Sequence, residues 1–354
     1  MNQPSQPIWA TLQQAGLVQG DAPLTDKLES PWYVKFLLAF SGWFASLFLL
    51  GFLGVGFEAI FKNNIACGIT GGLMIAGAYA ILRIPKNEFF EHVALAVSLA
   101  GQALIAWGLF DGLNDKVAWI FVALVQVVLA VVMPNFVHRV FSSFIAAFSF
   151  SMFLYAFGAP YIFSSIVMFI AAWLWLHEFQ YPKHTRKIHA IGYGTVLGLI
   201  QLKGVALFSF NPTGWHMVKT NTELWIQPWM AEVLAGAVMI YVVWQLLQRL
   251  GHRLPEPLAI TALVCTVILS SVSIEAPGIT VGIMILLLGF AGSNRVLMGL
   301  GIVSLLFYIS SYYYLLDATL LVKAQTLFVT GIVLLLVRWV MLKMIRWEKG
   351  TTHD

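Results

Sequence analysis

The feature that most constrains this chain is a series of apolar runs, each about as long as a lipid bilayer is thick. Twelve such runs follow one another between Trp32 and Met344. A transmembrane helix needs about 20 apolar residues, within a range of about 17 to 25. Helices are expected because hydrocarbon offers no partner for free backbone groups, and uniformly apolar runs do not fit the alternating strands of a barrel. We therefore predict an all-α, polytopic bundle of about twelve transmembrane spans.

Most of the predicted spans have the length that a bilayer requires. The tenth is the weakest, because Glu275 and Pro277 lie at its start and its strictly apolar part is short. The predicted spans are 32–57, 65–82, 93–110, 117–133, 140–157, 161–176, 188–210, 230–250, 258–273, 274–292, 296–316 and 320–344.

Composition supports lipid as the solvent for most of the chain. Hydrophobic residues make up 60% of the 354 residues and charged residues 10%, whereas soluble domains carry about 25% charged residues. The cysteines, Cys67 and Cys265, lie in apolar runs and are interpreted as small buried hydrophobes. No secretory signal peptide is visible in the first 30 residues. We expect the first membrane helix to act as the targeting signal.

The basic residues predict the orientation. Cytoplasmic loops are enriched in Lys and Arg, and twelve spans with the N-terminus inside place fifteen basic residues inside and five outside. If the tenth run did not cross, the division would be eleven against nine. We therefore predict that both termini are cytoplasmic and that the net charge of +4 reflects topology rather than nucleic-acid binding. The outer residues are Lys62, Lys116, Lys203, Lys219 and Lys323.

These boundaries divide the chain into three parts. Residues 1–31 form a cytoplasmic tail, 32–344 the membrane domain and 345–354 a second cytoplasmic tail. Within the first tail, residues 8–18 fit a short amphipathic helix, either an interfacial foot or a loosely ordered segment. Arg83-Ile84-Pro85 and Arg253-Leu254-Pro255 lie six spans apart and suggest two halves, 32–177 and 188–344. A common stop signal explains the same pattern and is the favoured interpretation.

Ionisable residues within the spans mark the first candidate site, because each costs about 2.5–3.5 kcal/mol near a helix centre. Lys203 and Glu232 lie roughly 10 Å and 6 Å below the outer surface on consecutive, antiparallel spans, so they can form an ion pair. Gln201 and nearby glycines would support a polar substrate or proton site there. The alternative, which we favour, is that Lys203 extends outward and Glu232 caps a helix start.

Two further groups are weaker candidates. Asp317 and Lys323 flank an outer turn that follows three tyrosines, and they form either a ligand or partner surface or, more simply, a solvated turn. His177, His184 and His189 surround one basic inner loop, where a metal or pH-sensing role competes with the favoured interpretation of a polar loop. No zinc-ligand spacing is present, and no metal site is predicted.

Known catalytic motifs are missing from the sequence. It has no G-x-x-x-x-G-K-[ST] phosphate loop, no G-x-S-x-G nucleophile elbow and no Asp inside a predicted span. We therefore expect no enzyme activity, no catalytic residue, no cofactor and no nucleic-acid partner.

Several stretches together carry a family resemblance. They are Trp9-x-x-Leu12-x-x-Ala15-Gly16-Leu17-Val18, Pro31-Trp32-Tyr33, Gly42-Trp43, Phe48-Leu49-Leu50-Gly51-Phe52, Ala94-Leu95-x-x-Ser98-Leu99-Ala100-Gly101-Gln102, and Gly289-Phe290-Ala291-x-x-Asn294-Arg295 through Tyr312-Tyr313-Tyr314 to Thr319-Leu320-Leu321-x-Lys323. Over most of its length the chain resembles domain-of-unknown-function family 4401, a set of bacterial inner-membrane proteins. The resemblance implies a multi-pass location in the inner membrane. It also implies a partner, a second small membrane protein with a GDYxxLxY signature, and it assigns no site residues.

Two functions remain as hypotheses. The first is a non-enzymatic subunit of an inner-membrane complex, which is suggested by the short loops and the implied neighbour. The second is a secondary transporter or exporter of a small solute, which is suggested by the spans, the two possible halves and the Lys203–Glu232 pair.

Overall fold

The computed structural model describes residues 13–16, 31–56, 58–83, 88–156, 162–209, 228–251, 256–275, 277–315 and 319–351. These residues are helical apart from their connecting turns, and they contain no strand. The chain divides into two units, Met1–Leu38 and Ala39–Asp354. The first unit contributes the start of α2, and all later helices belong to the second. The predicted amphipathic helix over 8–18 lies outside the described residues except at 13–16.

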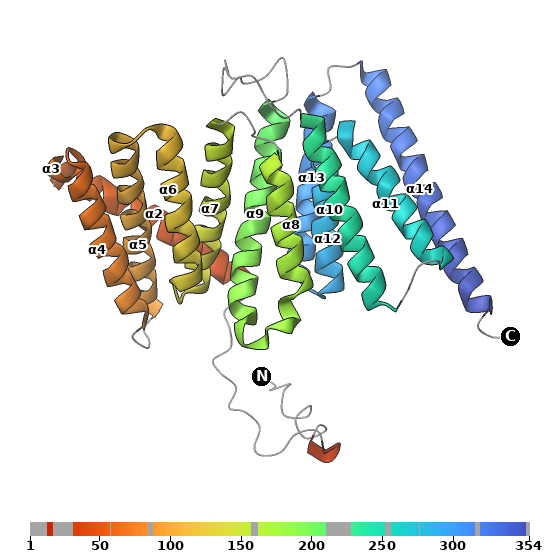
Figure 1. Cartoon of the computed structure of the whole chain (residues 1–354), viewed down its shortest axis with the longest axis horizontal. Helices are drawn as coiled ribbons and strands as arrows, with labels where there is room; N and C mark the ends of the chain where they lie inside the picture. The colour runs from red at the N-terminus through yellow and green to blue at the C-terminus, as the bar shows by residue number, and fades with distance from the viewer. Residues whose placement is uncertain are drawn as a thin grey trace. The chain divides into compact units, whose positions relative to one another are not determined.

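Within the described ranges, twelve helices of 13 or more residues coincide with the twelve predicted runs (Figure 1). They are α2 (Trp32–Gly56), α4 (Asn64–Arg83), α5 (Glu88–Gly112), α6 (Asp115–Val132), α7 (Phe136–Ala156), α8 (Ile162–Leu176), α9 (Thr185–Ser209), α10 (Pro228–Arg249), α11 (Pro257–Glu275), α12 (Ile279–Ala291), α13 (Arg295–Leu315) and α14 (Leu320–Thr351). Short turns of helix also occur at α3 (Glu58–Phe61), η1 (Glu178–Gln180) and η2 (Pro182–His184).

Seven of the described helices are long and apolar enough to cross a membrane. They are α4, α5, α6, α7, α9, α10 and α13. Shorter apolar helical stretches lie in α2, α8, α11 and α12. The chain is therefore all-helical and has the character of a membrane protein.

The tenth run differs from its predicted boundaries. Glu275 is the last residue of α11, and α12 begins only at Ile279. Gly278 between them has a φ of 98°, and a Cβ there would lie 2.7 Å from the ring of Tyr308. A side chain is thus excluded both by backbone conformation and by the space available. Helix α12 is short because this turn occupies the polar start of the tenth predicted run.

Helices α8, α9, α10, α12 and α13 share one apolar core, to which α7 also contributes. Neighbouring pairs include α8 with α9 and α10, α9 with α12 and α13, and α10 with α11 and α12. Their buried residues form one cluster that includes Met168, Val242 and Met284. On one side of it α7 packs closely along α9, because a Cβ at Gly194 would lie 2.4 Å from the Val140 carbonyl oxygen. Any side chain at Gly194 would push the two helices apart.

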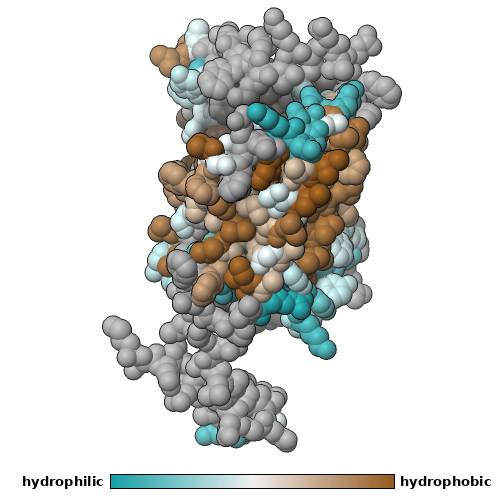
Figure 2. Space-filling model, turned by 90° about the vertical axis from the view of Figure 1, so that its left-hand side faces the viewer, coloured by the Kyte–Doolittle hydropathy of each residue, from teal (hydrophilic) through white to brown (hydrophobic). Residues whose placement is uncertain are grey.

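The surface is largely apolar where it is not covered by another helix. Ile65, Ile69 and Leu73 follow one stripe of α4 and are each at least 60% exposed. Figure 2 shows apolar side chains forming a belt on one face, with hydrophilic groups above and below it. Such a pattern is favourable when hydrocarbon, rather than water, contacts the middle of the helices.

Candidate functional site

The charged pair predicted from the sequence is formed in the structure. Lys203 on α9 donates to Glu232 Oε1 on α10, and their side chains are 2% and 6% exposed. The prediction that the two residues can pair is therefore confirmed. The favoured alternative, an outward-reaching Lys203 and a capping Glu232, is not what the structure contains. Their functional role stays a prediction.

Backbone carbonyls close to the pair also accept side-chain hydrogen bonds. Ser165 on α8 donates to the Ala231 carbonyl oxygen at 2.7 Å. Tyr308 on α13 is fully buried and donates to the Ile200 carbonyl oxygen at 3.0 Å. Glu232 also interacts electrostatically with Tyr308. The ion pair therefore lies where α8, α9, α10 and α13 meet.

The pair leaves hydrogen-bonding capacity unused. Glu232 Oε2 is buried and has no hydrogen-bond partner. The ammonium group of Lys203 has three donors, of which Glu232 accepts one. An unsatisfied buried acceptor costs about 1–3 kcal/mol. The arrangement thus offers both a donor and an acceptor to a further polar group.

Gln201 also carries a buried oxygen, Oε1, without a hydrogen-bond partner. It lies two residues before Lys203 on α9, and residues at that spacing do not face each other on a helix. Gln201 Oε1 therefore makes no hydrogen bond to Lys203, and a shared site of Gln201 with the Lys203–Glu232 pair stays a prediction.

The second predicted group is described only in part. Asp317 lies outside the described residues. Lys323 is half-buried, and its ammonium lies 5.3 Å from the centroid of the Tyr313 ring, within cation–π range. Its backbone N–H donates to the Thr319 carbonyl oxygen. Lys323 thus has an aromatic partner on α13. This contact fits the simpler interpretation of a turn beside an aromatic belt.

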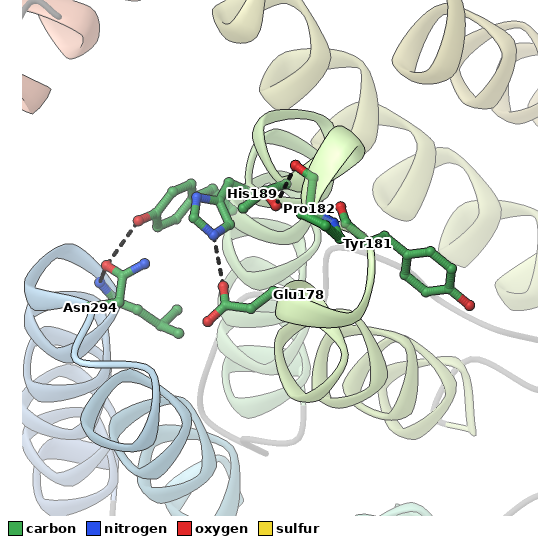
Figure 3. Close-up of polar contacts among 8 residues, drawn as sticks. Glu178, Tyr181, Pro182, His189 and Asn294 are labelled. Carbon is green, nitrogen blue, oxygen red and sulfur yellow. Dashed lines mark hydrogen bonds and ion pairs between the residues drawn. The ribbon is translucent and has the colours of Figure 1, made fainter. Parts of the chain in front are cut away.

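A polar cluster of which the sequence predicted only His189 as a candidate lies at the other end of α9 (Figure 3). Glu178 in η1 is buried, and its Oε2 lies 2.7 Å from His189 Nε2 on α9. Trp175, the last aromatic residue of α8, stacks on the His189 ring at 5.3 Å. Close packing permits this stacking, because a Cβ at Gly192 would lie 2.9 Å from the indole of Trp175.

This cluster reaches the turn between α12 and α13. The Tyr193 hydroxyl on α9 donates to Asn294 Oδ1 at 2.9 Å, and the same oxygen accepts the Leu297 backbone N–H at the start of α13. Asn294 therefore caps one helix and ties it to another. Glu178 at the end of an apolar run was the available sequence signal, but the link from Tyr193 to Asn294 joins residues far apart in the chain.

Two of the three histidines around the α8–α9 connection have different surroundings. His189 pairs with Glu178, whereas His177 stacks on Trp173 and its Nδ1 lies 2.8 Å from the Trp173 carbonyl oxygen. Among the described residues, no group of three His, Cys, Asp or Glu side chains is arranged to hold a metal ion.

A third buried network crosses α5, α6 and α7. The His138 ring is fully buried, with Nε2 lying 2.7 Å from Ser98 Oγ and 2.9 Å from the Gln102 amide nitrogen. Gln126 donates to Gln102 Oε1 at 2.9 Å. Because an amide N–H can only donate, Nε2 accepts and the ring proton lies on Nδ1, facing Ser142 Oγ at 3.3 Å. Gln126 Oε1 ends the network without a partner.

Comparison with known proteins gives one match. The family model described as Domain of unknown function (DUF4401) matches residues 31–344, nearly the whole chain. Comparisons with curated proteins and with solved structures gave no match.

Proposed function

This chain belongs to the family Domain of unknown function (DUF4401), and on that premise we propose that it is a secondary transporter of a small polar or charged solute in a bacterial inner membrane. The observation that carries the proposal is the buried Lys203–Glu232 pair with an unused carboxylate oxygen. Ionisable residues inside a membrane are costly, and where they occur they commonly mark a substrate or ion pathway.

The transport proposal includes a twelve-span topology with both termini cytoplasmic. Twelve described helices coincide with the apolar runs, and from α4 to α14 consecutive helices run in alternating directions (Figure 1). The basic residues divide fifteen to five under this arrangement. With this orientation, the Lys203–Glu232 pair belongs to the outer half of the bundle and the Glu178–His189 pair to its inner end.

The location of both pairs on α9 supports transport further. Lys203 and His189 are fourteen residues apart on that helix, which corresponds to roughly 21 Å along its axis. A transporter needs polar contacts that can open on either side of a central site. We infer that α9 carries one such contact near each end. No catalytic step is proposed, because the sequence carries no recognised catalytic motif.

Reconstitution in proteoliposomes tests the proposal with a broad panel of solutes. Solid-supported-membrane currents are recorded while amino acids, amines, organic acids and inorganic ions are applied in turn. The wild type should give a solute-dependent current that the double variant Lys203→Met with Glu232→Leu loses. Lys62→Met, which removes an exposed lysine outside the core, should keep the current. Equal currents in the wild type and the double variant would end the proposal.

A second candidate function is a non-enzymatic subunit of a membrane complex, and α14 favours it. This helix packs against α11, yet apolar residues on several of its other positions are exposed, among them Leu321, Phe328 and Leu336. A second small membrane protein of the GDYxxLxY type would cover such a surface. Purification in mild detergent tests this candidate. A protein that co-purifies with the wild type but not with Phe328→Ala would support it, and a monodisperse monomer alone would count against it.

A further inference from the structure

Arg139 is a buried cation for which the structure gives no anionic partner. It lies in the first turn of α7, and the residue is only 6% exposed. Its Nε has no hydrogen-bond partner. The guanidinium group stays charged at every physiological pH. A buried charge without a partner is strongly unfavourable. An opposite charge bound beside Arg139 would therefore stabilise the protein.

Another cation, the exposed Arg186, adds a smaller electrostatic penalty to the charge of Arg139 beside the larger one from its burial. Arg186 is the second residue of α9, the helix that packs along α7 through Gly194. Neither arginine forms an ion pair within the part of the chain that the structure describes. A buried carboxylate at this end of α9 belongs to Glu178 in η1, and its Oε2 is engaged by His189. The buried Arg139 therefore has a cation near it and no compensating carboxylate among the described residues.

The backbone increases the positive potential at this position. Helix α7 begins at this position, α9 begins nine residues before Gly194, which packs at Val140, and the first turns of both carry no acidic residue. A helix start has the positive end of the macrodipole and backbone N–H groups without intrahelical partners, so cations are disfavoured and anions favoured there. The two helix starts and the two guanidinium groups thus all favour binding of an anion.

We propose that Arg139 and Arg186 form a binding site for a phosphate group between the starts of α7 and α9. The guanidinium fork matches two phosphate oxygens at once, which a chloride ion cannot exploit. The phosphate comes either from an inner-leaflet phospholipid headgroup or from free phosphate. The site lies on different residues from the Lys203–Glu232 pair, and it holds whether or not the protein transports a solute.

Thermal unfolding of the full chain in phosphate-free maltoside detergent tests the site. Inorganic phosphate and phosphatidylglycerol are titrated separately, with sodium chloride at equal ionic strength as the reference. At least one of the two should raise the melting temperature of the wild type. In Arg139→Gln the apparent Kd for that ligand should be about tenfold weaker or more, because charge-assisted hydrogen bonds are lost. Native mass spectrometry should show bound lipid or phosphate on the wild type and its loss from Arg139→Gln.

Arg83→Gln is the matched control. It removes one arginine from a helix end, but Arg83 already has a partner, since it donates to the Tyr79 hydroxyl and lies 4.9 Å from the Tyr79 ring. This variant should bind like the wild type. If Arg139→Gln does not fold, Arg186→Gln and Arg139→Lys, which keeps the charge but loses the fork, carry the same expectation. Failure of both ligands to stabilise the wild type, or equal binding by the folded variants, would overturn the proposal.

Discussion

At the scale of single residues, the buried charges dominate the energetics. Lys203 and Glu232 are removed from water, and their mutual attraction compensates only part of the desolvation cost. Removing one partner leaves an unpaired charge in the core. Replacing both by apolar residues of similar volume removes the desolvation cost and the attraction together. The double substitution should therefore change the stability much less than either single substitution.

A double-mutant cycle on this pair is the first prediction. Lys203→Met and Glu232→Leu should each destabilise the protein by about 3–5 kcal/mol, whereas the double variant should be within about 1–2 kcal/mol of the wild type or more stable. Reversible unfolding in mixed detergent measures all four proteins. Additive effects of the two single substitutions would show that the pair is not coupled.

The second prediction concerns the hydrogen bond between Tyr193 and Asn294. Tyr193→Phe removes the hydroxyl, keeps the ring against Trp175, and should cost about 1–2 kcal/mol, since Asn294 Oδ1 retains the Leu297 N–H. Hydrogen exchange should accelerate at the start of α13 and stay unchanged in α4. A variant as stable as the wild type with unchanged exchange would contradict this link between helices.

At the scale of elements, close approach between helices depends on glycine. Gly71 on α4 and Gly101 on α5 face each other, and a Cβ on either would lie within 2.7 Å of the other's carbonyl oxygen. Gly194 does the same for α9 against α7. Small residues at such positions allow dispersion contacts and Cα–H···O contacts that larger side chains prevent, which is how helices associate in lipid without a hydrophobic driving force.

The third prediction follows from that packing. Gly194→Ala should destabilise the protein by about 1–3 kcal/mol, because the new methyl group meets backbone and not a flexible side-chain end. Gly299→Ala on α13 is the control. A Cβ there meets nothing within 4 Å, so this change should be neutral or stabilising by up to about 1 kcal/mol through helix propensity. Comparable melting temperatures for the two variants would contradict the close contact between α7 and α9.

At the scale of the whole molecule, the alternation of helix direction and the distribution of charge agree. Each helix from α4 onward reverses the direction of the preceding one (Figure 1). The basic residues of the predicted inner set include Lys183 in η2, Arg186 at the start of α9, and Arg338 and Lys343 near the end of α14. Alternating helices with an even number of spans return the chain to its starting side.

The fourth prediction is the topology that follows from these alternations. Reporter domains fused after residue 354 and inserted at Lys183 should behave as cytoplasmic, whereas a reporter inserted at Lys219 should behave as periplasmic. The physical reason is the preference of lysine and arginine for the cytoplasmic side. Alkaline phosphatase and green fluorescent protein fusions measure the two locations independently. A periplasmic C-terminus would require an odd number of spans or an inverted orientation, and either would exclude this arrangement.

The sequence by itself determined the helical class and the helix positions, and it showed that Lys203 and Glu232 could pair, although the alternative was favoured. It did so because hydropathy, turn residues and spacing along consecutive helices are local properties. Family membership was also visible, since its motifs are contiguous. The helix boundaries in the structure differ from the predicted ones where a turn interrupts an apolar run, as at Gly278 and Ile279.

Only the tertiary structure decided which distant residues meet. The Glu178–His189 cluster joins an α8–α9 connection to Asn294, and the His138 network draws on three helices. Arg139 and Arg186 come together only because α7 packs along α9. Such contacts depend on which helix faces pack, and in lipid those faces are chosen by small residues and polar contacts rather than by hydrophobicity, which all faces share.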